Sequence, residues 1–269
     1  MREDPHRTIR ALLASTNPEE LRQGLQFVKR EISRIGSEEA KPLFEIVSTI
    51  FYIDPLDRPD LVPLLDEAIS LVVGFGKWII PVLIQQLEGS DLKAQMAVAH
   101  ALGRIGADAI EALMVEYQSS PNPACRSFIL YTFGKIKSPK IVQATDIALE
   151  AASSQDRELR DTAMRAIGKM VESIPPGHLP EGVRHGFIDV LRENLADQSA
   201  SIRAKAVRSL GKLAKYGHLT PEERTQFKST LDVVLGKDER FEWDRAYVVR
   251  REAEEALNHV SGTGRNAVK

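Results

Sequence analysis

The sequence is poor in cysteine, in aromatic residues and in net charge. Cys125 is its only cysteine, so no disulfide can form within the chain, and a reducing compartment is compatible with it. Because Cys125 falls at an apolar position of a predicted helix, we expect it to be a buried small hydrophobe. Aromatic residues make up only 6% of the chain, which fits a core of Ala, Leu, Ile and Val. The net charge of −2 gives the chain no overall attraction to nucleic acid or to anionic membranes.

Long apolar runs and targeting signals are also missing. The longest apolar stretch, residues 69–84, is too short to cross a bilayer and is interrupted by Ser70, Gly74, Gly76, Lys77 and Pro81. Residues 1–6 are polar and no apolar run follows them, so we expect no signal peptide. These features predict a cytoplasmic protein without a membrane segment.

The common signatures of catalysis and cofactor binding are absent from the sequence. It contains no Gly-x-Ser-x-Gly nucleophile elbow. Gly74 and Gly76 have neither a preceding strand nor the remainder of a phosphate-binding fingerprint. His178 and His218 occupy equivalent positions in two matching segments, which indicates duplicated structure rather than a metal site. We therefore predict no catalytic residue, no cofactor and no metal.

What the sequence does contain is a phrase that recurs along the chain. It consists of a small residue, an apolar residue, a glycine, a basic residue and another apolar residue. The copies are 101–105, 132–136, 166–170 and 209–213, with a degraded copy at 256–260. The marker glycine therefore stands at 103, 134, 168 and 211, with Asn258 in the last copy. Self-similarity at such intervals is typical of a repeat array.

Each phrase ends a predicted helix that is the second member of a pair. The residues two, five and nine positions before the marker are small or apolar, and these offsets fall on one side of a helix. Asp91 is an expected N-cap, and Thr220 with Glu223 forms an expected capping box. Toward the N-terminus we predict a helix between Asn17 and Gly36, followed by a pair over residues 38–52 and 60–73. No stretch alternates long enough to predict a strand.

Together these residues resemble HEAT repeats, in the short bacterial form often called phycobilisome-lyase-like. The resemblance rests on Ile80-Pro81-Val82-Leu83-Ile84, on Asp91 and on the phrase that begins at Ala101. It also rests on an arginine eight positions before the marker, at Arg126, Arg160, Arg203 and Arg250. The copy with its marker at Gly103 departs from this pattern and has Gln95 at that position. Because this offset borders the buried stripe, we expect Arg160 and Arg203 to serve structure more than binding.

The resemblance covers residues 18–260 and implies an all-α, right-handed α-solenoid of about six HEAT-like helix pairs. The second helices of the pairs would then line the concave side. We predict one continuous solenoid domain over residues 18–260. It would be preceded by a polar N-terminal segment at 1–17 and followed by a disordered tail at 261–269.

A ridge of basic and polar residues is the first candidate for a binding surface. The positions three before and one after the marker are four residues apart and share a helix face. The basic ridge is Arg30, Arg34, His100, Arg104, Tyr131, Lys135, Arg165, Lys169, Arg208 and Lys212. Such a ridge suits an acidic segment of a protein partner or a phosphate backbone. It is also compatible with an ordinary solvated face, and Glu158 and Asp161 near it reduce its charge.

The second candidate is the aromatic insertion between the two helices of the last repeat, residues 240–247. It contains Phe241, Trp243 and Tyr247. Two interpretations stay open: a cap over the open end of the array, and a loop that docks a partner through Trp243.

Repeat arrays are usually binding surfaces, so the sequence favours a non-catalytic scaffold or adaptor that grips a protein partner on its concave face. The resemblance also permits a subunit of a chromophore lyase or another chaperone-like enzyme accessory. Nucleic-acid binding is a third hypothesis that rests on the basic ridge alone, and the net charge disfavours it. The absence of His-Glu dyads argues against the iron-binding deoxyhypusine hydroxylases, which are built on the same repeat.

Overall fold

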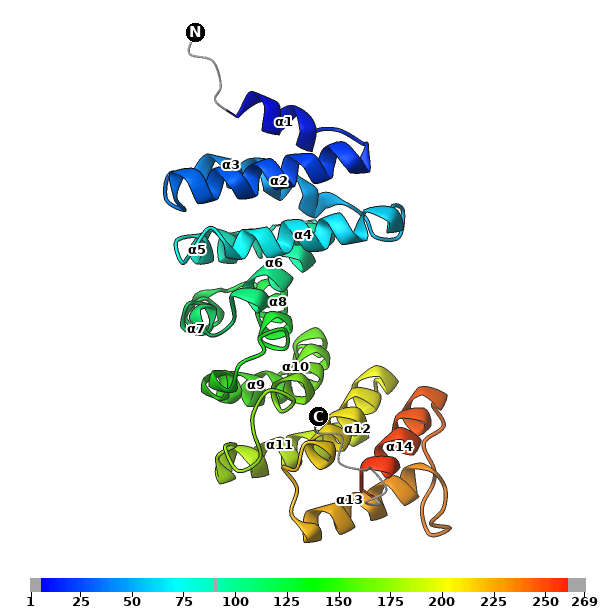
Figure 1. Cartoon of the computed structure of the whole chain (residues 1–269). Helices are drawn as coiled ribbons and strands as arrows, with labels where there is room; N and C mark the ends of the chain where they lie inside the picture. Colours follow the sequence, from blue (N-terminus) through cyan, green and yellow to red (C-terminus); the bar gives the residue numbers. More distant parts are fainter. Residues whose placement is uncertain (1–5, 90, 261–269) are drawn as a thin grey trace. The chain divides into compact units, whose positions relative to one another are not determined.

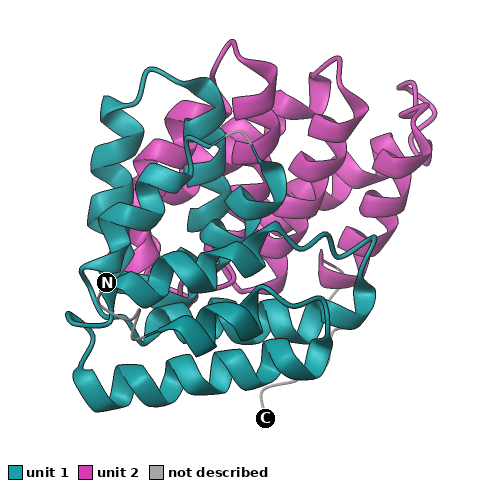
Figure 2. Ribbon diagram, turned by 90° about the horizontal axis from the view of Figure 1, so that it is seen from above, with its two compact units in different colours: residues 1–135 teal, residues 136–269 magenta. Residues whose placement is uncertain are grey.

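The computed structural model describes residues 6–89 and 91–260, and this part of the chain contains helices and no strand (Figure 1). The predicted all-α solenoid is confirmed. The chain divides into two compact units, residues 1–135 and 136–269 (Figure 2). The predicted tail, residues 261–269, lies outside the described residues.

Unit 1 contains four helix pairs, each with a first and a second member. The α-helices are α1 (Arg7–Leu13), α2 (Pro18–Ile35), α3 (Lys41–Val47), α4 (Val62–Val73), α5 (Ile79–Gln86), α6 (Leu92–Ile105), α7 (Ile110–Ser119) and α8 (Pro123–Phe133). Short 3-10 helices extend them: η1 (Ser48–Tyr52) follows α3, η2 (Pro59–Leu61) precedes α4, and η3 (Gly106–Ala109) precedes α7. The predicted boundaries of α2, α4 and the α3–η1 segment agree closely with these bounds.

Unit 2 contains three further pairs. Its α-helices are α9 (Thr145–Ala152), α10 (Arg157–Met170), α11 (Glu181–Glu193), α12 (Ala200–Lys215), α13 (Pro221–Val234) and α14 (Tyr247–Val260). The 3-10 helix η4 (Pro139–Ala144) precedes α9, and η5 (Asn194–Ala196) follows α11. The described residues thus form seven pairs rather than about six. The additional helix is α1, which lies inside the segment we describe as polar and buries Ile9 and Leu13.

Helix starts follow the expected capping chemistry. The Asp91 carboxylate accepts hydrogen bonds from the backbone N–H groups of Lys93 and Ala94, both at 2.9 Å. The Thr220 hydroxyl accepts from the N–H of Glu223, while the Glu223 carboxylate accepts from the N–H of Thr220. Both predicted caps are therefore confirmed, and they fix where the paired helices begin.

Within each unit, first helices pack against first helices and second helices pack against second helices. In unit 1, the second helix α6 packs against α4 and α8, and in unit 2 α12 packs against α10 and α14. The residues five positions before the marker, Val98, Ile129, Ala163, Ala206 and Ala253, are fully or almost fully buried, and three of them are alanine. Their small size lets neighbouring second helices approach closely.

Three of the marker glycines, Gly103, Gly168 and Gly211, stand inside helices, whereas Gly134 follows the last residue of α8. A Cβ added to Gly168 would overlap the Ser209 hydroxyl oxygen, and one added to Gly211 would lie 3.0 Å from the Cβ of Ala256. A Cβ at Gly103 would overlap the Cβ of Lys135. At Gly168 and Gly211 the missing side chain therefore allows close contact with the next second helix, and at Gly103 it allows contact with Lys135, just beyond the end of α8.

The arginine eight positions before the marker ties each second helix to the turn before it. Arg160 donates to the carbonyls of Ser154 and Gln155 at 2.9 and 3.0 Å, and Arg203 repeats this with Asp197 and Gln198. Gln95, the departure from the pattern, donates through its amide to the carbonyls of Leu87 and Gly89. A neutral side chain thus performs the same task there.

In unit 2 these arginines also reach the following repeat. Arg160 donates to the Asp197 carboxylate at 3.0 and 3.2 Å, and Arg203 donates to Asp244 at 2.6 and 3.0 Å. Burial alone would raise the pKa of Asp244, but the hydrogen bonds from Arg203 and from the N–H of Ala246 lower it below its ordinary value. The ladder of arginine–aspartate pairs supports the structural role expected for Arg160 and Arg203.

The marker position generates a test of the packing. Gly168→Ala should destabilise the protein by about 1–3 kcal/mol, because its methyl group would displace Ser209, whose hydroxyl donates to the carbonyl of Met164 at 2.6 Å. Gly182→Ala is the matched control: Gly182 lies in α11 with nothing near its Cβ direction, and the change should stabilise by up to about 1 kcal/mol. Equal melting temperatures for the two variants would contradict this packing.

Candidate partner-binding surfaces

The ridge residues of unit 1 are held by contacts between neighbouring second helices. The Nε2 atom of His100 lies 3.1 Å from the Tyr131 hydroxyl, and the Lys135 ammonium lies 4.7 Å from the centre of the Tyr131 ring. Arg104 donates to the Asp66 carbonyl at 2.7 Å and also binds the Asp66 carboxylate and the Ser70 hydroxyl. His100, Tyr131 and Lys135 therefore lie together, with Lys135 just beyond the end of α8, whereas Arg104 binds α4.

The two ridge residues of α2 interact with their own helix. Arg34 pairs with Glu31, three residues earlier, through hydrogen bonds of 2.9 and 2.5 Å. The guanidinium of Arg30 lies 5.8 Å from the centre of the Phe27 ring. Both side chains are exposed, so these contacts contribute little to stability.

In unit 2 the carboxylate of Glu172 forms ion pairs with three lysines. The carboxylate accepts from Lys212 at 2.6 Å, from Lys169 at 3.1 Å and from Lys137 at 3.3 Å. The Glu172 side chain is only 14% exposed and that of Lys212 only 18%. Burial would raise the pKa of Glu172, but the hydrogen bonds and positive charges of Lys212 and Lys169 lower it to about 2.

The neighbouring ridge residue Arg208 forms a bidentate pair with Glu252 on α14, with distances of 2.8 and 2.6 Å. Glu252 is buried and accepts a further bond from Arg251 at 2.8 Å. Arg165 lies exposed on α10. The structure thus places Arg208 and Lys212 in ion pairs between repeats and Lys169 in an ion pair within its own repeat, and their role in binding stays a prediction.

These carboxylates are the residues that the sequence pattern misses. Glu172 and Glu252 stand at unrelated offsets from the marker, so no periodicity points to them. Asp161, which we noted near the ridge, binds Lys205 and accepts from the Ser201 hydroxyl at 2.8 Å. Which carboxylate meets which cation depends on how neighbouring second helices are aligned.

The aromatic insertion of unit 2 is held in place by several bonds. The Asp244 carboxylate accepts hydrogen bonds from Arg203 and from the backbone N–H of Ala246, the latter at 2.8 Å. The guanidinium of Arg250 stacks 4.5 Å from the centre of the Trp243 ring. Phe241, Trp243 and Tyr247 nevertheless remain largely exposed. The insertion is therefore an ordered surface with exposed aromatic rings, and both interpretations, cap and docking loop, stay open.

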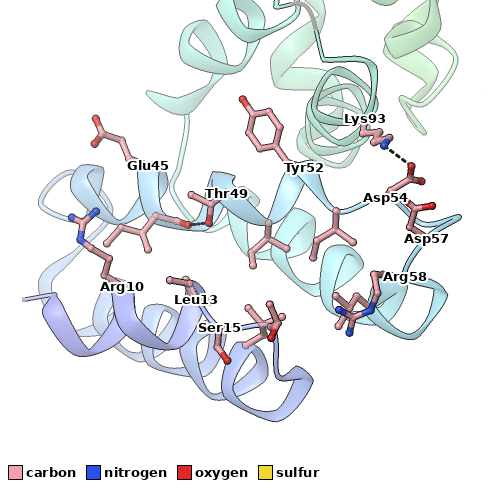
Figure 3. Close-up of a pocket in the computed structure, with 17 residues that line it drawn as sticks. Arg10, Leu13, Ser15, Glu45, Thr49, Tyr52, Asp54, Asp57, Arg58 and Lys93 are labelled. Atoms are coloured by element: carbon pink, nitrogen blue, oxygen red, sulfur yellow. Dashed lines mark hydrogen bonds and ion pairs between the residues drawn. The ribbon is translucent and has the colours of Figure 1, made fainter.

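A groove of about 600 Å³ lies in unit 1 between α1 and the α3–η1 segment (Figure 3). Its apolar wall includes Leu13, Leu21, Ile46, Ile50, Ile53 and Leu61. Figure 3 shows Arg10 and Glu45 toward one end, with Asp54, Asp57, Arg58 and Lys93 toward the other. A second hollow of about 310 Å³ shares Tyr52 with this groove and reaches α5 and α6. The sequence analysis does not find the groove, because one of its walls is α1.

Among the described residues, one cluster offers three ligand atoms to a metal ion. Ligand atoms of Glu88, Glu116 and Cys125 lie within 4.8 Å of one another. Cys125 is buried, as predicted, and burial raises the pKa of its thiol.

The Glu172 cluster generates a second test. Glu172→Gln should destabilise unit 2 by about 1–3 kcal/mol, because Lys212 would keep its buried charge without a counterion. Since folding lowers the pKa of Glu172, its contribution is complete above the ordinary pKa of about 4.5 and is lost as the pH falls toward 2. The difference between wild type and variant in urea unfolding should therefore shrink between pH 5 and about pH 2.5.

Asp189→Asn provides the control, because Asp189 is exposed on α11 and forms no ion pair with the described residues. It should match the wild type at each pH. A Glu172→Gln variant as stable as this control at neutral pH would contradict the structural role of the cluster.

Comparison with known proteins agrees with this architecture. The HEAT-repeat family model matches residues 80–168. No curated protein sequence matches the chain. No helix among the described residues is both long and apolar enough to cross a membrane.

Solved structures share the fold at low sequence identity. A chain from the complex of CpcE and CpcF of phycocyanin lyase from Nostoc sp. PCC7120 is 20% identical, with a TM-score of 0.55 over 68% of this chain and 99% of that chain. An engineered protein, target OR329, is 16% identical, with a TM-score of 0.53 over 97% of this chain and 98% of that chain. Residues 80–168 therefore match HEAT repeats, and the chain shares its fold with these two solved structures.

Proposed function

We propose that the protein is a non-catalytic scaffold that binds a partner protein on the face of its second helices, the face expected to be concave. Repeat proteins of this fold present extended surfaces to protein partners. The observation that carries the proposal is a group of exposed apolar side chains on that face in unit 1. Burial of such side chains is the main source of free energy in protein association.

The exposed apolar group lies beside the basic ridge. Leu92, Met96, His100 and Arg104 are spaced by four residues, so they share one face of α6. Leu92 is 61% exposed and Met96 is 42% exposed. On α4, Val62 is 41% exposed and lies eight residues before Ser70, which Arg104 contacts. The face therefore combines apolar side chains with His100 and Tyr131, a composition that suits a protein partner.

The charges of the ridge support a protein partner over a nucleic acid. Neutralising a phosphate backbone requires cations that are available to it. Arg104, Lys169, Arg208 and Lys212 instead pair with carboxylates of this chain. We therefore expect random duplex and single-stranded DNA or RNA to give no gel shift at physiological salt. A clear shift would favour the nucleic-acid hypothesis.

A second candidate function rests on the resemblance to the phycocyanin lyase complex. In that case the protein would be an accessory subunit in chromophore attachment, acting beside a second subunit. The described residues contain no arrangement that points to catalysis by this chain alone. Visible absorbance of the protein purified from its native host is a direct check, since a bound chromophore would colour it.

The scaffold proposal is tested by changing the exposed apolar group without disturbing the ion pairs. Reversing Lys212 or Arg208 to Glu is unsuitable, because it would place a carboxylate against Glu172 or Glu252. Leu92→Gln with Met96→Gln should instead reduce capture of the native partner at least tenfold. Val115→Gln is the control, since Val115 is also exposed but lies on the first helix α7.

The free energy of unfolding of both variants should lie within about 0.5 kcal/mol of the wild-type value, because exposed substitutions rarely change it by more. Partner capture would be measured by quantitative mass spectrometry of proteins retained from the host extract. If the double variant retains the same proteins as the control, this face is not the binding surface, and the insertion around Trp243 becomes the better candidate.

A further inference from the structure

We infer that the partner contributes an amphipathic α-helix, with aliphatic side chains along one edge and carboxylates along the other, that lies across the second helices of unit 1. This rests on the proposed function, because it takes the face of α2, α4, α6 and α8 as the binding surface. It adds the conformation of the bound segment and its charge.

The second helices of unit 1 lie side by side with corresponding halves together. α6 packs against α4 and α8, and α4 packs against α2 (Figure 1). His100 in the second half of α6 lies beside Tyr131 in the second half of α8. Arg104 at the end of α6 binds Ser70 in the second half of α4. The first halves therefore form one edge of the face, and the second halves form the other.

The edge formed by the first halves is apolar. Val62 is the first residue of α4, Leu92 is the first residue of α6, and Met96 follows one turn later. Their exposed fractions are 41%, 61% and 42%. Ala124, near the start of α8, is exposed as well, whereas Val73 at the end of α4 is exposed at the opposite edge. Aliphatic side chains of an amphipathic helix suit this apolar edge.

The edge formed by the second halves carries an excess of cations. Glu31 is the only carboxylate in these halves and pairs with Arg34, while Arg104 pairs with Asp66 from the first half of α4. Arg30 and Lys135 form no ion pair with the described residues, and each instead lies over an aromatic ring. Their positive charges favour carboxylates on the partner at this edge.

The separation of the two edges fits the width of an α-helix. Arg104 follows Met96 by eight residues, which corresponds to about 12 Å along α6. An α-helix with its side chains is about 10–12 Å wide, so it can contact both edges at once. An extended strand directs every second side chain to a surface in a single row and would reach one edge alone. Four second helices about 9 Å apart span about 27 Å, the length of about 18 helical residues.

The test uses three synthetic peptides and methyl NMR of the full chain. The probe has five copies of Leu-Glu-Gln-Ala, which places leucines and glutamates on adjacent stripes of a helix. The second peptide carries Lys in place of each Glu, and the third carries Pro in place of each Gln. The probe should shift the methyl signals of Val62, Leu92 and Met96, whereas those of Val115 on α7 should stay unchanged.

The three peptides should differ in affinity. The lysine peptide should bind about three- to tenfold more weakly than the probe, as expected for a few exposed charge pairs. The proline peptide keeps the leucines and the charges but cannot form the helix, so it should bind about tenfold more weakly or worse.

Two pairs of substitutions test the charged edge. Arg30→Gln with Lys135→Gln should remove most of the preference for glutamate over lysine. Arg7→Gln with Lys140→Gln is the matched control, because both side chains are exposed and lie outside the second helices, on α1 and η4. The control should keep the preference of the wild type.

Any of three results would overturn the inference: no shift of Val62, Leu92 and Met96 at millimolar probe, equal binding of the glutamate and lysine peptides, or equal binding of the proline peptide. The proposed function fails on a different result, capture of the native partner by the variant with Leu92→Gln and Met96→Gln. If that variant loses the partner while the proline peptide binds like the probe, the face binds an extended segment, and only the amphipathic helix is refuted.

Discussion

The structure depends on the close approach of neighbouring second helices at the marker glycine. At Gly168 and Gly211 the next second helix occupies the space of the missing side chain. This contact fixes both the distance between the helices and their alignment along the axis. Small residues before the marker, such as Ala163 and Ala206, extend the contact along the helix. The pairing of charged side chains at the edges of the contact is a consequence of that alignment.

The ridge illustrates how a repeated pattern can acquire different roles. In unit 2 the alignment brings Lys212 to Glu172 and Arg208 to Glu252, so cations that the pattern places on an open face are bound between repeats. In unit 1 the same positions hold His100 and Tyr131, which bond to each other and leave apolar neighbours exposed. The repeat therefore places the side chain on the same helix face in each copy. Whether that side chain forms a structural ion pair or is available to a partner depends on the residues of the neighbouring second helix.

Most of the fold could be predicted from the sequence because the repeat encodes it locally. The phrase around Gly103, the cap at Asp91 and the capping box at Thr220 each act within a few residues. The short helix α1 was missed because it has only two buried residues, Ile9 and Leu13, which is too little for a periodic signal. The groove depends on α1 and was missed with it. The partners of the ridge, Glu172 and Glu252, could not be predicted, since pairing between repeats is set by packing and not by spacing along the chain.

The Glu172 cluster has a consequence for how unit 2 unfolds. A repeat protein behaves like a one-dimensional chain of units, each coupled only to its neighbours, and the coupling strength determines whether the units melt together or one at a time. Glu172 connects Lys137 before α9, Lys169 at the end of α10 and Lys212 on α12. One carboxylate thereby joins the start and the end of its own repeat to the second helix of the next repeat. Loss of this carboxylate would therefore weaken the coupling between the repeat of α9 and α10 and the repeat of α11 and α12.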